Sequence, residues 1–293
     1  MRYRVKHITE YKYVEAVTHC YNLAHMTPRS TRRQRCFSSD VIVSPRPAVH
    51  SQRVDYFGNQ AYHFEIQQRH KKLTITVVSD IETKDQPISQ NFDFGISCAE
   101  ALAQIQRSTK PDDILAREFL LSSPLIRIQH DEIREYAAAS FEDDKPLLSC
   151  VMDLTSRIYR DFEYSPESTT VSTPLIEVLE KKQGVCQDFA HFQIACLRAL
   201  GFPSKYVSGY IETLPPPGKE KLVGADASHA WISVYSPAEG WVEFDPTNDT
   251  LATEQHIITA WGRDYSDVTP LKGIVYGGGE DPVLHVSVDV AAQ

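Results

Sequence analysis

The sequence has no long hydrophobic run. No stretch of its 293 residues approaches the roughly 20 apolar residues that a membrane-spanning helix needs. The opening residues, 1–6, are largely basic and polar and include no apolar core of the kind found in secretory signals. We therefore expect a cytoplasmic protein without a membrane partner.

The six cysteines lack the spacing of a metal site or of a disulfide framework. They stand at positions 20, 36, 98, 150, 186 and 196, and no two of them form a CxxC pair. Such usage favours reduced thiols in a cytosol. The chain also lacks an EF-hand-like run of acidic ligands. We therefore expect neither a metal nor another cofactor.

The chain has no excess of positive charge. It holds 30 Lys and Arg against 39 Asp and Glu, a formal charge of −9, which argues against a general nucleic-acid binder. One basic cluster, 29–35, departs from this trend. A solvated loop is favoured there over a phosphate site. A hydrophobic fraction of 42% is ordinary for a globular protein, and 293 residues suggest one large or two medium domains.

Residues 1–95 predict an antiparallel β-sandwich. Short runs that alternate aromatic or β-branched residues with polar ones recur through this region, as in a half-buried sheet. Phe57-Gly58-Asn59 is a turn signal between two such runs. Closely spaced short strands are typical of a sandwich. No catalytic set of residues stands out in this region.

The rest of the chain predicts an α+β organisation. A helical connector is expected over 96–145 and a catalytic domain over 146–293. Helices are predicted at 98–106, 111–120, 131–140, 146–161, 174–182 and 186–200, and strands at 204–211, 229–235, 240–244 and 283–290. The spacing of apolar residues in 186–200 predicts one buried face. The Pro-rich stretch 214–219 is expected to be an exposed flap, and the three glycines at 277–279 a flexible turn.

Cys186 is the strongest candidate for a nucleophile. It follows Gly184-Val185 and begins a predicted helix. Unpaired amides at a helix start stabilise negative charge on sulfur and can also receive an oxyanion. A lone cysteine is more often inert and buried, so its position carries the argument. Cys196, in the middle of the same helix, is expected to be structural.

His229 and Asp245 are the candidate partners of Cys186. His229 opens a predicted strand, and Asp245 ends the next one, so neighbouring antiparallel strands can bring them together. A histidine can act as the base, and an aspartate can hold its orientation and charged form. Taken alone, His229 is better explained as a surface residue and Asp245 as a turn former before proline. The ordered Cys, His, Asp set outweighs these separate explanations.

Four motifs stand around these residues: Gly184-Val-Cys-Gln-Asp-Phe-Ala-His191, Tyr206-Val-Ser-Gly-Tyr210, Asp226-Ala-Ser-His-Ala-Trp231 and Phe244-Asp-Pro-Thr-Asn248. Together they resemble the bacterial transglutaminase-like superfamily, a group often described as cysteine proteases. The segment 262–270 also resembles one that follows the core in these proteins, and the N-terminal strands resemble the transglutaminase N-terminal region.

The resemblance implies a papain-like core in which the nucleophile helix packs on an antiparallel sheet. It also implies that Cys186 is the nucleophile, His229 the base and Asp245 the orienting acid of a triad that forms a thioester acyl-enzyme. Tyr164 and Gln187 are candidates for the oxyanion or cleft. We expect a peptide or amide substrate that is hydrolysed. The alternatives are amine transfer by a protein-glutamine gamma-glutamyltransferase and a non-catalytic peptide-binding scaffold; the oligomeric state stays open.

Overall fold

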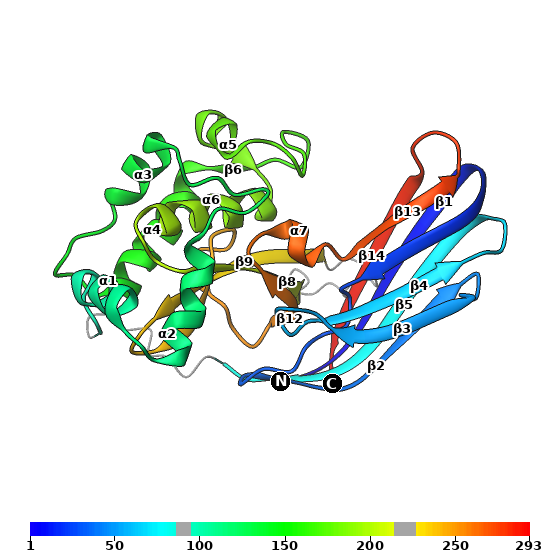
Figure 1. The fold of residues 1–293 in the computed structure, drawn as a ribbon, viewed down its shortest axis with the longest axis horizontal. Helices are drawn as coiled ribbons and strands as arrows, with labels where there is room; N and C mark the ends of the chain where they lie inside the picture. Colours follow the sequence, from blue (N-terminus) through cyan, green and yellow to red (C-terminus); the bar gives the residue numbers. More distant parts are fainter. Residues whose placement is uncertain (86–94, 214–226) are drawn as a thin grey trace, which may run out of the picture.

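A computed structural model describes residues 1–85, 95–213 and 227–293. A large N-terminal sheet lies against a core in which helices cover a second sheet (Figure 1). The predicted Pro-rich flap at 214–219 lies outside the described residues. In the described part of the chain, no helix combines the length and the apolar character that crossing a membrane requires.

The N-terminal sheet is organised around one long strand, β1 (Arg2–Ala24). Antiparallel strands pair with both edges of β1, and two successive strands occupy each edge. These partners are β4 (Gln60–Ile66) and β5 (His70–Thr83) on one side and β13 (Leu271–Gly277) and β14 (Val283–Ala292) on the other. The sheet is completed by β2 (Gln34–Ser44) on β5 and β3 (Val49–Val54) on β4.

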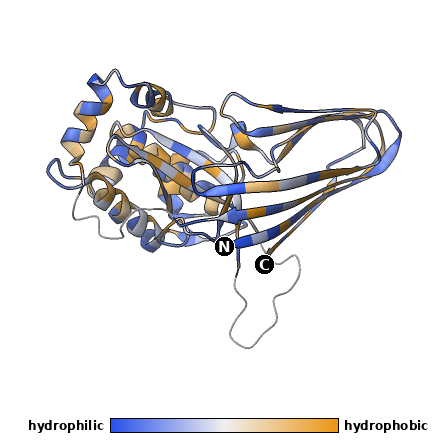
Figure 2. Cartoon of the chain, turned by 90° about the horizontal axis from the view of Figure 1, so that it is seen from below, coloured by the Kyte–Doolittle hydropathy of each residue, from blue (hydrophilic) through white to orange (hydrophobic). Residues whose placement is uncertain are grey.

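The sheet folds over on itself where β1 bends. The pairing of β1 shifts register between Lys12 and Val17. Residues from both halves then share one core: Val17 and Phe64 from one half cluster with Leu73 from the other. The predicted antiparallel sandwich is thereby confirmed, and its strands alternate hydrophilic and hydrophobic residues (Figure 2).

Three glycines let the returning chain follow this bend. Gly277, Gly278 and Gly279 have φ values of 91°, 93° and 79°, in the region that glycine adopts without strain. They lie against residues of the β1 bend, Gly278 beside Val17. The flexible turn expected there is thus a shaped connection between β13 and β14.

Strand pairing joins residues 271–292 to the N-terminal sheet, although the sequence places them in the region 146–293. Both halves of β1 have an edge that β13 and β14 cover, and covering a strand edge satisfies its backbone groups. The boundaries 1–95, 96–145 and 146–293 stay a prediction as domain limits.

The core sheet has five antiparallel strands in the order β11-β10-β9-β8-β12. They are β8 (Ser204–Ile211), β9 (Ala227–Ser236), β10 (Gly240–Asp245), β11 (Thr250–Leu251) and β12 (His256–Gly262). The predicted strands 204–211, 229–235 and 240–244 are present, whereas the sequence analysis assigned no strand to 256–262.

The helices pack around the core sheet, and α6 lies directly on β8 and β9. They are α1 (Cys98–Arg107), α2 (Pro111–Ala116), the 3-10 helix η1 (Arg117–Leu120), α3 (Asp131–Ala138), α4 (Leu147–Asp161), α5 (Leu175–Lys181), α6 (Cys186–Ala199) and α7 (Tyr265–Val268). Two short parallel strands, β6 (Glu163–Tyr164) and β7 (Gln183–Gly184), lead to α6. Five of the six predicted helices match a single α-helix closely, and 111–120 divides into α2 and η1.

Helix α6 is the centre of the core and not a surface helix. Every residue from Asp188 to Arg198 is buried, so the prediction of a single buried face is wrong. The helix packs on β8 and β9 on one side and against α3, α4 and α5 on the other, where Phe192 joins the same core as Ile232. A helix enclosed on all sides needs apolar residues on all sides.

The two sheets are joined by a packed interface. Tyr3 of β1 and Val288 of β14 share a cluster with Tyr210 of β8 and Ile257 of β12. The side chain of Gln34 adds hydrogen bonds to both backbone groups of Ile258. The N-terminal sheet is therefore continuous with the core through apolar and polar contacts.

The basic cluster 29–35 divides between solvent and this interface. Arg32 and Arg35 are exposed, as a solvated loop requires. Arg29 and Arg33 are buried, so that interpretation is wrong for them. Arg33 forms an ion pair with Glu243 of β10, and its guanidinium also donates to backbone carbonyls of the core. A buried guanidinium needs such partners because desolvation is costly.

Candidate active site

Cys186 is the first residue of helix α6, as the sequence predicts. The turn before it is held by Asp188, whose Oδ2 accepts a hydrogen bond from the backbone N–H of Val185 at 2.9 Å. Gly184 allows this approach, because a Cβ there would lie 2.8 Å from the Asp188 side chain. Cys186 is partly exposed, whereas Cys196 is buried within the helix. The first-turn amides of α6 are therefore available beside a reachable sulfur.

His229 and Asp245 lie at the same end of the core sheet. The ladder between β9 and β10 ends at the pair Phe244 and Ile232, so the two side chains meet diagonally beyond it. The distance from His229 Nε2 to Asp245 Oδ2 is 2.7 Å. Cys186 and His229 line the same pocket, and the nearby Cys186 helps to raise the pKa of His229. Since Nε2 faces the carboxylate, Nδ1 is the nitrogen left for the thiol, and the structure brings the three predicted residues together.

The surroundings favour an ion-paired site. Burial disfavours the charged imidazole of His229, but its hydrogen bond with Asp245 and the nearby Cys186 outweigh burial and raise its pKa to about 10. For Asp245, burial alone would favour protonation, yet the hydrogen bonds from His229 and His256 hold its pKa well below the usual range. His229 is thus held as a cation beside the thiol.

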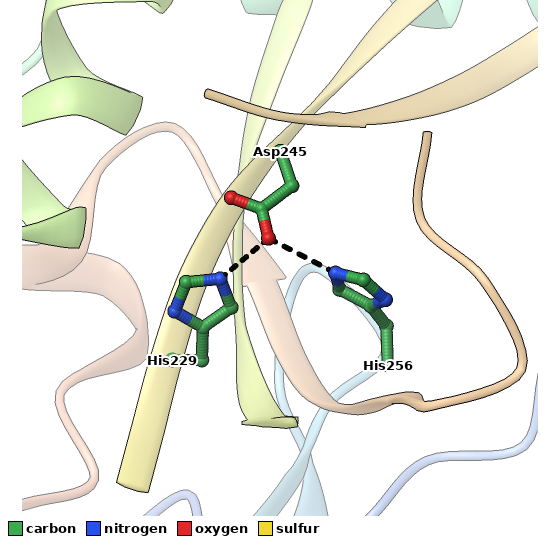
Figure 3. A group of neighbouring side chains, drawn as sticks. All are labelled: His229, Asp245 and His256. Atoms are coloured by element: carbon green, nitrogen blue, oxygen red, sulfur yellow. Dashed lines mark hydrogen bonds and ion pairs between the residues drawn. The ribbon is translucent and has the colours of Figure 1, made fainter. Parts of the chain in front are cut away.

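His256 is a fourth member of the cluster that the sequence analysis missed. Its Nε2 lies 3.0 Å from Asp245 Oδ2, so one carboxylate oxygen faces two histidines (Figure 3). The backbone N–H of Thr253 donates to His256 Nδ1 at 3.1 Å, which fixes the proton of His256 on Nε2. The side chain of Asn248 donates to the same carboxylate oxygen at 2.6 Å, and the N–H of Thr247 donates to Oδ1 at 2.9 Å.

These hydrogen bonds argue against a metal ion at this cluster. His229, Asp245 and His256 do present ligand-type atoms within 4.8 Å of one another. A metal on His256 Nε2 would displace its proton to Nδ1, which would break the bond from Thr253. The amide group of Asn248 also points at Asp245 Oδ2, where a cation would have to bind. The donors around the carboxylate fit an orienting role for it and not a ligand role.

A second chain of contacts supports the imidazole from the N-terminal sheet. The indole of Trp231 stacks on His229, with ring centroids 5.9 Å apart. Its N–H donates to Glu243 at 2.8 Å, and Glu243 pairs with Arg33 at 3.0 Å. Arg33 also donates to the backbone carbonyl of His256. Both histidines are therefore held by groups that Arg33 ties to the N-terminal sheet.

Cys186 and His229 open into a pocket of about 300 Å³. Its core side includes Tyr206 of β8 and Tyr265 of α7. The opposite wall comes from the N-terminal sheet, through residues of β1 and β14 such as Tyr11 and Leu284. This wall is not predicted from the sequence, because no local pattern indicates which face of a distant strand meets the site.

The two oxyanion candidates lie near Cys186 in different ways. Gln187 lines the pocket, and its side-chain amide lies 3.5 Å from the carbonyl of Val171. Tyr164, on β6, is 55% exposed and is not among the pocket residues. Burial and, after it, the nearby Cys186 raise the pKa of Tyr164. An oxyanion role for either residue stays a prediction.

Two signals could have revealed more of the site from sequence. Asn248 belongs to the motif that begins at Phe244, three residues after Asp245, and its amide could have been paired with that carboxylate. His256 precedes the β-branched run Ile257-Ile258-Thr259, which is typical of a buried strand. A strand assigned there would have placed His256 at a strand start, as with His229.

Family models match both parts of the chain. The bacterial transglutaminase-like N-terminal region matches residues 3–82, and the transglutaminase-like superfamily matches residues 134–246. The second match includes Cys186, His229 and Asp245.

Relatives extend the similarity over the whole length. An uncharacterized protein of Mycobacterium tuberculosis is 44% identical over 296 residues, covering 99% of this chain and 92% of that protein. A solved structure from Cytophaga hutchinsonii, described as a candidate cysteine protease, has a TM-score of 0.75 at 21% identity and covers 100% of this chain and 91% of that one. At that identity the likeness shows the fold. The protein-glutamine gamma-glutamyltransferase of Pseudomonas aeruginosa is 29% identical over 137 residues, which cover 43% of this chain and 20% of that enzyme.

Proposed function

Since this chain belongs to the transglutaminase-like superfamily, we propose that it is a thiol hydrolase that cleaves a peptide, isopeptide or related amide bond. The observation that carries the proposal is that Cys186 and His229 line one pocket while His229 is hydrogen-bonded to Asp245. Cys186 supplies the nucleophile, His229 moves the proton and Asp245 orients the imidazole.

In the acylation step, the thiolate of Cys186 attacks the substrate carbonyl carbon and forms a C–S bond. First-turn amides of α6 are suitably placed to receive the negative charge on the carbonyl oxygen. His229 gives its proton to the leaving nitrogen as the C–N bond breaks. The products are a thioester on Cys186 and a free amine.

In the deacylation step, water attacks the thioester while His229 accepts a proton from the water. The C–S bond breaks, the carboxylic acid leaves, and the Cys186–His229 pair is restored. Asp245 keeps Nε2 of His229 oriented through both steps, and His256 and Asn248 hold Asp245 in turn. Water is the default acceptor because exclusion of water requires a closed site.

Amine transfer is the second candidate function, favoured by the partial likeness to a gamma-glutamyltransferase. The same thioester serves both reactions, so the acceptor decides between them. A non-catalytic scaffold is the third candidate, and the presence of all three residue types, with His229 hydrogen-bonded to Asp245, speaks against it.

The test is to incubate the protein with a library of short peptides that includes glutamine-containing members, together with a fluorescent primary amine. Mass spectrometry then measures free acid against amine conjugate. We expect free acid from the wild type and none from the Cys186→Ser variant. Predominant conjugate at millimolar amine would instead identify a transferase. Absence of both products, with Cys186 no more reactive than a free cysteine, would favour the scaffold.

A further inference from the structure

The pocket wall opposite helix α6 is built by the N-terminal sheet. Thr9 and Tyr11 of β1 and Val286 and Leu284 of β14 line it. We propose that this wall determines substrate choice by accepting an uncharged, apolar group beside the carbonyl that Cys186 attacks. The inference rests on the proposed thiol hydrolase activity and adds the substrate class that the site accepts.

The strand register explains why these side chains share one face. Tyr11 pairs with Leu284 and Thr9 pairs with Val286 across the antiparallel ladder. Directly paired residues point to the same side of a sheet, and alternate residues along a strand do so as well. Closer to the chain ends, Tyr3 on the same face of β1 is packed against the core. One face of β1 therefore contributes side chains to the buried interface near its start and to the pocket wall further along the strand.

The wall from the N-terminal sheet offers no charged partner to a substrate. Among the described residues that line the pocket, none is Lys, Arg, Asp or Glu, and the cationic His229 is already paired with Asp245. The apolar lining includes Val185, Pro270 and Leu271 in addition to Leu284 and Val286. A charged group placed there would lose water without gaining a counter-ion, which is costly, whereas an apolar group gains by leaving water.

The histidine that the N-terminal sheet adds to the pocket lining, His7, is held neutral. Burial lowers the pKa of His7 to about 4. Both of its ring nitrogens already have partners: Nδ1 lies 2.8 Å from the hydroxyl of Tyr210, and Nε2 lies 2.9 Å from the hydroxyl of Thr9. The Tyr210 hydroxyl donates to the carbonyl of Met26, so His7 donates from Nδ1 and accepts at Nε2. His7 is therefore neither a counter-ion for an acidic substrate nor a free donor.

The size of the pocket sets a further limit. A volume of about 300 Å³ is at the small end of the range of about 300–1,000 Å³ for ligand pockets. It suits one apolar side chain and the adjoining carbonyl better than a long segment of peptide. The preferred substrate is thus a peptide or amide with a single large apolar residue, such as leucine or phenylalanine, next to the attacked carbonyl.

The experiment uses a series of peptidyl fluoromethyl ketones that differ only in the residue next to the reactive group: leucine, phenylalanine, glutamine, glutamate or lysine. Intact-mass spectrometry of the full chain gives the rate at which each probe modifies Cys186. We expect the leucine and phenylalanine probes to react at least about tenfold faster than the glutamate and lysine probes.

Two variants of the wall test its role, with a matched control on the same strand. Leu284→Glu and Val286→Glu should each slow the leucine probe by about tenfold or more and narrow its advantage over the lysine probe. These side chains are 51% and 44% exposed, so the substitutions are compatible with folding. Val283→Glu changes a side chain that is 66% exposed and does not line the pocket, and it should leave all rates within about twofold.

Labelling of Cys186 by iodoacetamide, together with a thermal unfolding curve, separates the outcomes. Equal rates for the leucine and glutamate probes, or an unchanged preference in both wall variants, would overturn the selectivity while the hydrolase proposal stands. Failure of every peptidyl probe to react faster with Cys186 than with Cys36 would overturn the hydrolase proposal itself. Should a glutamate variant unfold, Val286→Thr and Leu284→Gln provide the same comparison with smaller changes, and an unchanged preference in both would equally overturn the inference.

Discussion

Asp245→Asn tests the electrostatic arrangement most directly. The carboxylate accepts hydrogen bonds from three side chains at Oδ2 and one backbone N–H at Oδ1. An asparagine would place its oxygen where the three donors converge, which leaves its NH2 group facing the N–H of Thr247. One unsatisfied donor pair costs roughly 1–3 kcal/mol, so the variant should fold with reduced stability.

The second effect of Asp245→Asn is on the pKa of His229. A pKa raised from 6.5 to about 10 corresponds to roughly 5 kcal/mol in favour of the imidazolium. Without the carboxylate, burial prevails, and the pKa of His229 should fall below 6.5. The sulfur of Cys186 then loses its neighbouring cation. A hydrogen bond to a charged group contributes about 1.5–3 kcal/mol, so alkylation of Cys186 at pH 7.5 should slow by about ten- to a hundredfold.

The pH dependence of stability should change as well. Because the pKa of His229 is raised on folding, its contribution is complete below pH 6.5 and is lost as the pH rises through about 10. The wild type should therefore lose stability between pH 7 and pH 10. The Asp245→Asn variant, with an uncharged His229 across that range, should lose much less.

Three measurements check this reasoning: the rate of iodoacetamide labelling of Cys186, an NMR titration of the His229 ring, and thermal unfolding at several pH values. Glu142→Gln makes the same carboxylate-to-amide change in an exposed ion pair with Lys145 and serves as the control. A His229 pKa that stays above 8 in a folded Asp245→Asn variant, with an unchanged labelling rate, would refute the assignment of Asp245.

Further predictions concern reactivity and packing. Cys186 should be alkylated fastest of the six thiols. Cys36 is also partly exposed, but burial raises the pKa of its thiol, so it should react more slowly. Labelling followed by peptide mapping ranks the six rates, and a faster reaction at Cys36 would contradict the activation of Cys186. Gly209→Ala should destabilise the protein by about 1–3 kcal/mol in urea unfolding, because a Cβ there would overlap the carbonyl oxygen of Ile257 and lie 2.7 Å from Trp231. Gly95→Ala, where the nearest atoms are 3.8 Å away, should have little effect. Arg33→Met should cost roughly 3–5 kcal/mol of unfolding free energy, since it removes the buried guanidinium that pairs with the largely buried Glu243, whereas the exposed Arg32→Met should be neutral.

The sequence predicts most of the elements because their signals are local. Apolar spacing and turn residues place α4, α6 and the hairpin around Gly58 within a few residues of their observed bounds. The candidate triad could be proposed because each member follows a recognisable element start or end. The motif around Cys186 and its place at a predicted helix start were therefore enough to propose it as a site residue.

What the sequence could not supply depends on contacts between distant segments. His256 acts on Asp245 from β12, which pairs with β8 and not with β10, so no hairpin spacing relates them. The burial of Arg33 depends on Glu243, 210 residues away. Local charge density alone makes such an arginine look solvated, because the partner that neutralises it belongs to another layer.

The pairing of β1 with β13 and β14 also bears on how the protein is made. During synthesis β1 emerges first and β14 last among the described strands, so one edge of β1 stays uncovered while nearly all the intervening chain is translated. An uncovered edge invites pairing with other chains. The thiol on α6 emerges before Leu284 and Val286, which complete the pocket. A nascent chain thus carries its reactive group before the wall that governs access to it, and a chaperone that shields the free edge of β1 would protect both.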